Sequence, residues 1–216
     1  MIQRDSQGRR IWDISQLLGP ELPVWPGDTA FEHKRTWQME DGSPVNVSAL
    51  TLSTHSGAHA DAPLHYDPNA PDIATVDLLP YLGECLVVDA RGSNGAVEVG
   101  DLPHLHSADR VLFRTYDRFP HGAWLEDFTA IAPETIEWLA VQGVKLIGTD
   151  APSIDPQESK TMDAHKAVLK ADMRILEGLV LDDVPEGRYE LIALPLPILR
   201  GDASPVRAIL RELPDA

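Results

Sequence analysis

The sequence predicts a single α/β domain over residues 1–216, with a mixed β-sheet and flanking helices. Three observations support this. The chain has 216 residues, its composition is ordinarily globular with 43% hydrophobic residues, and strand-like and helix-like segments mix without a strict alternation. A chain of this length can bury a core without disulfide or metal staples. No internal repeat and no change in composition marks a linker, so one domain is expected.

Strands are predicted wherever a short run is apolar or rich in β-branched residues. They cover residues 10–15, 46–53, 84–90, 110–115, 145–149, 175–182 and 188–194. Residues 19–28 contain three prolines and two glycines, and this stretch is predicted to be a loop.

Two helices are predicted, over residues 133–142 and 163–170. Pro133 suits a first helical turn, and Gly143 follows the first helix as a stop signal. Asp163 is expected to cap the second helix. Residues 206–213 fit a helical and a strand period equally well, so the residues alone leave the last element open.

The charge balance narrows the classes of partner. The chain has 18 basic and 34 acidic residues, a formal net charge of −16. It therefore lacks the positive footprint of a nucleic-acid-binding protein, and an anionic membrane surface would repel it.

Cys85 is the one cysteine, which excludes an intrachain disulfide, and its apolar run predicts a core position. With no apolar leader and no run of about 18 apolar residues, a cytoplasmic location is expected.

The chemistry is concentrated in residues 54–68, THSGAHADAPLHYDP. This stretch contains His55, His59 and His65 with Asp61 between them, and imidazole and carboxylate groups are ligands for zinc and similar cations. Gly57 and a nearby proline disfavour a helix in this stretch. The stretch is therefore predicted to be an extended chain that bends. In an extended chain the side chains of His59 and Asp61 point to the same side, and their Cα atoms lie about 6.6 Å apart.

The sequence indicates a metal site more strongly than a purely structural cluster. Three imidazoles and a carboxylate would each need a buried partner if they served structure alone. A single cysteine excludes cysteine-rich zinc sites, whereas carboxylate ligands with an open position suit metal-assisted hydrolysis. Asp61 could also bridge two cations. Four other histidines are interpreted as ordinary surface or core residues: His33, His104, His106 and His121. The pair His104 and His106 could bind a metal, but it has no carboxylate pattern nearby.

Residues 55–65 resemble the HxGxHxDxPxH signature of the cyclase-type metal-dependent hydrolases. Within that superfamily nearly the whole chain is similar to the bacterial kynurenine formamidases, also called arylformamidases. The segments that carry this narrower resemblance are PVWPGD (23–28), GSPVN (42–46), DAPLHY (61–66), GTD (148–150) and DASPVR (202–207). Ala58 departs from a threonine common in the superfamily, but it is not a ligand position.

The resemblance implies a swivelling β/β/α fold, a strand for the last segment, a homodimer, and two Zn²⁺ ions per subunit. It implies hydrolysis of N-formyl-L-kynurenine to L-kynurenine and formate. The implied metal ligands are His55, His59, Asp61, His165 and Glu177, with Asp61 and Glu177 bridging. His65 matches the catalytic acid/base and Trp25 a substrate-contacting aromatic. From the residues alone, Trp25 suits stacking on an aryl ring and anchoring of its loop equally well.

Glu177 adds an argument of its own, because it lies in an apolar strand where its charge would need a partner such as a cation. Two other functions share the metal signature: another amide hydrolase of the superfamily, such as one that opens isatin, and a non-catalytic metal-binding protein. A serine or cysteine hydrolase is disfavoured, because the chain has no GxSxG motif and Cys85 has no neighbouring histidine.

Overall fold

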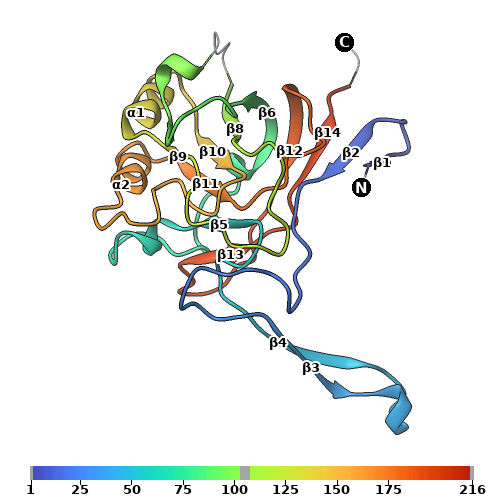
Figure 1. The fold of residues 1–216 in the computed structure, drawn as a ribbon. Helices are drawn as coiled ribbons and strands as arrows, with labels where there is room; N and C mark the ends of the chain where they lie inside the picture. Colours follow the sequence, from blue (N-terminus) through green and yellow to red (C-terminus); the bar gives the residue numbers. More distant parts are fainter. Residues whose placement is uncertain (1, 103–107, 215–216) are drawn as a thin grey trace.

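A ten-stranded mixed sheet organises the computed structural model, which describes residues 2–102 and 108–214 (Figure 1). In spatial order its strands are β1 (Ile2–Arg4), β2 (Arg10–Asp13), β14 (Ile209–Glu212), β12 (Gly187–Ile192), β6 (Leu82–Asp89), β8 (Arg110–Arg114), β10 (Leu146–Thr149), β11 (Arg174–Glu177), β5 (His59–Asp61) and β13 (Ala203–Pro205). The four central strands β6, β8, β10 and β11 are parallel, and the remaining pairs are antiparallel. The predicted α/β class with a mixed sheet is confirmed.

The middle residues of the inner parallel strands β8, β10 and β11 are apolar because both faces of these strands are covered. In β8, Val111 and Phe113 pack into one hydrophobic cluster, whereas Leu112 between them packs into the other. The first cluster also contains residues of the two helices, α1 (Pro133–Val141) and α2 (Asp163–Lys170), which lie side by side over this face (Figure 1).

The second cluster lies inside the curl of the sheet. Trp12 of β2 and Ala60 of β5 belong to it although their strands lie far apart in the spatial order. A flat sheet could not bring these side chains into one core, so the sheet must bend around it. Cys85 is buried in the same cluster, as predicted, and burial raises the pKa of its thiol to about 12, which leaves it unreactive at neutral pH.

The helix predictions are confirmed in place but not in capping. The structure gives 133–141 for the first helix and 163–170 for the second. The prediction that Asp163 is the N-cap of the second helix is wrong. Met162 is the N-cap, with a positive φ of 53° and no side-chain hydrogen bond to the helix. The Asp155 carboxylate instead accepts hydrogen bonds from the backbone N–H groups of Ala164 and His165, at 3.1 Å each. A residue distant in sequence thus satisfies the free donors of the first turn.

One strand prediction needs correction, and the segment that the residues left open is a strand, as the resemblance implied. The strand predicted over 175–182 ends at Glu177, because Gly178 takes a left-handed conformation with φ 64° that interrupts the ladder. The ambiguous segment 206–213 contains strand β14 and no helix, since it pairs with both β12 and β2. The remaining predicted strands are present, shifted by one or two residues at their ends.

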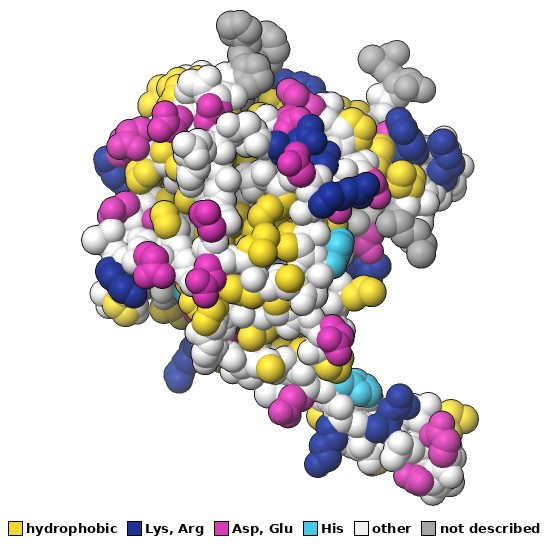
Figure 2. Space-filling view, viewed as in Figure 1, with side chains coloured by type: hydrophobic (Ala, Val, Ile, Leu, Met, Phe, Trp, Pro, Cys, Tyr) yellow, Lys and Arg dark blue, Asp and Glu magenta, His cyan; other side chains and the backbone are white. Residues whose placement is uncertain are grey.

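The smaller elements lie outside the main sheet. They are the two-stranded pair β7 (Ala96–Val97) and β9 (Ala130–Ile131), and the 3₁₀ turns η1 (Met39–Asp41), η2 (Pro63–His65), η3 (Leu79–Tyr81) and η4 (Val99–Asp101). A hairpin of β3 (Glu32–Trp37) and β4 (Val47–Thr51) projects away from the body (Figures 1 and 2). His104 and His106 lie outside the described residues. Among the described residues no helix is long and apolar enough to cross a membrane.

Candidate active site

Strand β5 delivers two of the predicted site residues. His59 and Asp61 lie two positions apart in this strand, so their side chains point to the same face, as predicted. The neighbouring strand β11 is antiparallel and places Glu177 directly opposite His59 in the register. Cross-strand neighbours of this kind have adjacent side chains, which brings a third donor to the face.

His55 reaches the same place through a tight turn before β5. Gly57 has φ 65°, and its carbonyl oxygen lies close to Gly178: a Cβ built on Gly178 would stand 2.5 Å from that oxygen. Only glycine permits this approach without a shift of the backbone. The same carbonyl accepts a hydrogen bond from Nδ1 of His59 at 2.9 Å, which turns Nε2 of His59 toward the cluster.

His165 is contributed by the first turn of α2. Its Nδ1 donates to the Asp155 carboxylate at 2.6 Å, so Nε2 is the ring nitrogen that faces Asp61, at 3.3 Å. The carboxylate that caps the helix therefore also orients this imidazole. Such an outer partner is the usual companion of a metal-ligating histidine.

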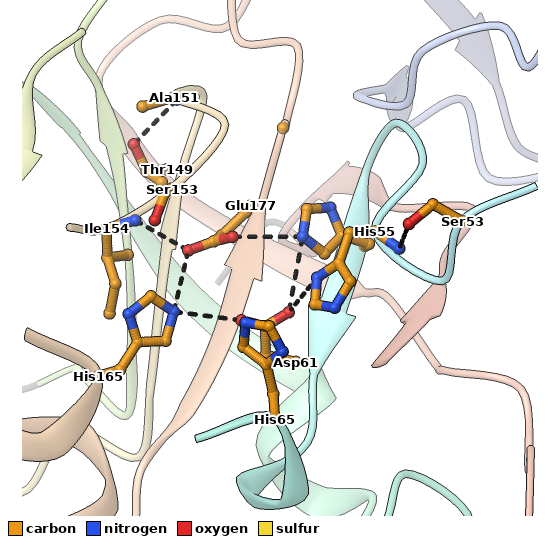
Figure 3. A network of polar contacts seen from close by, with 12 residues as sticks. Ser53, His55, Asp61, His65, Thr149, Ala151, Ser153, Ile154, His165 and Glu177 are labelled. Atoms are coloured by element: carbon orange, nitrogen blue, oxygen red, sulfur yellow. Dashed lines mark hydrogen bonds and ion pairs between the residues drawn. The ribbon is translucent and has the colours of Figure 1, made fainter. Parts of the chain in front are cut away.

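The two carboxylates lie between the three imidazoles (Figure 3). The Asp61 oxygens are 3.1 Å from Nδ1 of His55, 3.5 Å from Nε2 of His59 and 3.3 Å from Nε2 of His165. The Glu177 oxygens are 3.2 Å from Nε2 of His59 and 3.7 Å from Nε2 of His165. Each carboxylate thus faces at least two histidines, which is the placement a bridging ligand requires.

The cluster is deeply buried and not fully satisfied. Asp61, His59, His165 and Glu177 are each exposed by 3% or less. Nε2 of His59 and Oδ1 of Asp61 are buried and make no hydrogen bond of normal geometry, although oppositely charged groups lie 3.1–3.5 Å away, and polar atoms left in this way are costly. Ligand atoms of His59, Asp61 and Glu177 lie within 4.8 Å of one another, and so do those of His55, Asp61 and His65. The donor set fits one or two cations that share Asp61.

The protonation of the cluster supports this interpretation. Burial alone would lower the pKa of His55, but the Asp61 and Asp202 carboxylates outweigh it and raise that pKa to about 10. Burial likewise opposes the charge on His165, yet Asp155 and Asp61 raise its pKa to about 10. Burial would raise the pKa of Asp61, but the neighbouring histidines hold it well below its usual range. Two imidazolium charges therefore balance the carboxylates where a cation could replace them.

His65 lies at the edge of the cluster, at the end of the turn η2. Its ring centroid is 4.3 Å from that of His55, and its side chain is 30% exposed. Burial lowers the pKa of His65, and the positive charges of His55 and His165 act in the same direction. At pH 7 this imidazole is neutral and able to accept a proton.

A cleft of about 380 Å³ opens above the cluster. All three cluster histidines, His65 and Glu177 line it, together with an aromatic wall that contains Trp25, Phe119 and Trp124. Trp25 packs edge-to-face on Trp124, with ring centroids 5.3 Å apart. The volume suits a small organic ligand with an aromatic ring.

Every residue that the sequence analysis assigned to the site lies in or around this cleft. Three contributors were missed: Asp155, Asp202 and Trp124. The segment containing Asp202 had contributed to the resemblance, but nothing in the sequence places its carboxylate beside His55. Asp150 also lines the cleft, and its carboxylate accepts hydrogen bonds from Thr115 and from the backbone N–H of Tyr116.

A curled mixed sheet that carries a buried cluster of histidines and carboxylates under an aromatic cleft defines a metal-dependent hydrolase type of architecture. The family described as "Putative cyclase" matches residues 12–156. The chain therefore belongs to this cyclase family.

Relatives of known name agree with this assignment. A kynurenine formamidase of Erythrobacter litoralis (strain HTCC2594) is 71% identical over 208 residues, 96% of each chain. A solved structure described as a potential metal-dependent hydrolase with cyclase activity is 29% identical, with a TM-score of 0.83 over 96% of this chain and all of the other. Isatin hydrolase A from Labrenzia aggregata, at 22% identity, shares the fold with a TM-score of 0.82 over 96% of this chain and 95% of the other. The resemblance seen in the sequence is confirmed.

The histidine pKa values predict a steep pH dependence of metal binding. Below pH 10 the metal-free protein carries protons on His55 and His165, and a cation must displace both. Linkage then predicts that zinc affinity rises about 100-fold per pH unit between pH 6 and 8, and flattens once pH exceeds the raised pKa values. Competition with a chromophoric chelator, corrected for its own protonation, measures this slope. An affinity independent of pH would contradict the arrangement.

Proposed function

We propose that the protein hydrolyses N-formyl-L-kynurenine to L-kynurenine and formate, as one domain over residues 1–216. The observation that carries this proposal is the buried cluster of three histidines and two carboxylates at the base of an aromatic cleft. The 71% identity to a relative named kynurenine formamidase supports the choice of substrate. The substrate offers what the cleft can hold, a planar aryl ring beside a formamide.

The cluster would hold two Zn²⁺ ions, with Asp61 and Glu177 as the bridging carboxylates. The remaining ligands in this proposal are the three cluster histidines: His55, His59 and His165. When bound, such a cation lowers the pKa of water to about 7 and polarises a carbonyl oxygen, which overcomes the weak nucleophile and the weak electrophile of amide hydrolysis. The two buried atoms without a hydrogen bond of normal geometry, on His59 and Asp61, support this role.

His65 would carry the proton through the reaction. Its lowered pKa leaves it neutral at pH 7, so it can take a proton as water attacks the formyl carbon. It can then return that proton to the anilide nitrogen, which leaves poorly as an anion. The C–N bond breaks, and the amine and formate depart with the atoms of one water divided between them. One ring nitrogen of His65 also lies within 4.8 Å of ligand atoms of His55 and Asp61, so His65 could instead be a metal ligand.

Trp25 would bind the aryl ring of the substrate. Its loop is stiffened by prolines at 20, 23 and 26, and its indole is held edge-on by Trp124. A ring already held in one orientation loses little conformational freedom on binding.

We also propose a homodimer, for which the hairpin β3–β4 offers support. All residues of its two strands are exposed, including Trp37 at 58% and Leu50 at 54%. A two-stranded hairpin is only marginally stable alone in water, so a covering surface from a second copy would stabilise it. The molar mass in solution decides this point. A cytoplasmic location stays a prediction from the sequence.

The substrate is tested by measuring hydrolysis of N-formyl-L-kynurenine and of isatin by the same preparation. We expect efficient release of kynurenine, read by its absorbance, and a kcat/KM for isatin lower by a factor of at least about 100, because the cleft discriminates through the bound ring and formamide. The reverse order would reassign the protein to the isatin-opening group. A metal-loaded protein inactive on both would favour the non-catalytic alternative.

The role of His65 is tested with His65→Ala. If this residue is the acid/base, kcat should fall by about 10²- to 10⁴-fold while the metal content stays at the wild-type value. Steady-state kinetics and elemental analysis of the same sample measure both. Lys170→Ala, which removes an exposed side chain at the end of α2 away from His165, serves as the control. Loss of metal together with activity would make His65 a ligand.

Trp25→Ala separates substrate binding from anchoring of the loop. Loss of stacking should raise KM by about 10-fold with little change in kcat, since an aromatic contact contributes about 1 kcal/mol beyond its area. Trp25→Phe should retain most of the affinity because it keeps a ring in place. A normal KM for Trp25→Ala would count against contact with substrate.

A further inference from the structure

Asp202 is a carboxylate at the rim of the cluster that the proposed mechanism does not yet use. It lies directly before β13, and its side chain is 45% exposed. One oxygen, Oδ1, accepts a hydrogen bond from Oγ1 of Thr54 at 3.0 Å. The other oxygen, Oδ2, is 3.1 Å from Nε2 of His55 and 3.6 Å from Nδ1 of His65. A single carboxylate oxygen therefore faces both histidines.

The backbone holds this carboxylate firmly in place. The carbonyl oxygen of Asp202 accepts a hydrogen bond from the N–H of Ala62 at 2.8 Å, and β13 then pairs with β5, the strand that carries the cluster. On the other side, Gly201 closes a turn back to Ile198 and packs so tightly that an added Cβ would stand 2.9 Å from Ile73. With Thr54 fixing Oδ1, little freedom remains for Oδ2.

The cluster histidines share a pattern that Asp202 completes. Each has one ring nitrogen directed at the carboxylates and the other held by an outer acceptor. The outer acceptor is the Gly57 carbonyl for His59 and the Asp155 carboxylate for His165. For His55 the outer acceptor is Asp202, which leaves Nδ1 of His55 facing Asp61 at 3.1 Å.

We propose that Asp202 is a positioning residue that serves the metal centre and the proton carrier at once. Through His55 it fixes the tautomer and the ring orientation that direct Nδ1 into the cluster. Its negative charge also lies 3.6 Å from Nδ1 of His65, which favours a proton on Nδ1 and leaves Nε2 as the nitrogen that exchanges a proton in the cleft. The second half rests on the proposed function, since it assumes that His65 moves the proton.

The chemistry favours a carboxylate in this position. An anionic acceptor binds an imidazole N–H more strongly than a neutral one, and it raises the basicity of the opposite nitrogen. Because one oxygen serves both rings, a change at Asp202 should disturb metal affinity and proton transfer together. A residue that merely stabilised the fold would disturb neither selectively.

Asp202→Asn tests the first half by zinc affinity, measured by chelator competition without any substrate. We expect the affinity to fall by about 10- to 100-fold, the usual effect of losing an outer partner of a ligand. The matched control is Asp109→Asn, which removes the same charge from an exposed side chain directly before β8 and should leave zinc affinity unchanged. Thr54→Val, which frees Oδ1 but keeps the carboxylate, should give a smaller loss.

The second half is tested by combining Asp202→Asn with His65→Ala. If Asp202 acts on proton transfer through His65, Asp202→Asn should lower kcat in the wild type and leave kcat nearly unchanged in the His65→Ala background at saturating zinc. Equal losses in both backgrounds would overturn this role, and a wild-type zinc affinity in Asp202→Asn would overturn the role at His55. If the wild type does not hydrolyse N-formyl-L-kynurenine but the zinc affinity still falls, the proposed substrate fails and the role at His55 stands.

Discussion

Two carboxylates buried among three imidazoles are the constraint on which the rest of this structure depends. Asp61 and Glu177 are almost completely buried. An unpaired charge in such a buried position would cost several kcal/mol. Their charges are balanced by imidazolium groups when no cation is bound, and a cation can take over that balance. In the metal-free protein, protons on the histidines thus occupy positions at which a cation can bind.

The fold serves this constraint at several points. Pairing of β5 with β11 sets His59 opposite Glu177, and pairing of β5 with β13 brings Asp202 to the rim. The close approach of Gly178 to the Gly57 carbonyl lets the turn before β5 aim its histidines. The helix α2 contributes His165 from a first turn whose cap, Asp155, is also the orienting partner of that histidine. The contacts that stabilise the local structure therefore also set the geometry of the site.

The sequence was most informative where the pattern is local. The i, i+2 relation of His59 and Asp61, the helix over 163–170 and the buried run around Cys85 depend on near neighbours, and all were predictable. Contacts across the chain were not. No local signal says that Asp155 caps a helix eight residues later in place of Asp163. The place of β14 depended on two strands that only the folded sheet brings beside it.

The central claim joins the buried cluster to the chemistry through a metal. The most direct test is hydrolysis of N-formyl-L-kynurenine by the purified protein before chelation, after chelation and after zinc is restored. The account predicts that kynurenine formation disappears with the metal and returns with it, while the fold measured by circular dichroism persists. Undiminished turnover by a protein shown by elemental analysis to be metal-free would contradict it.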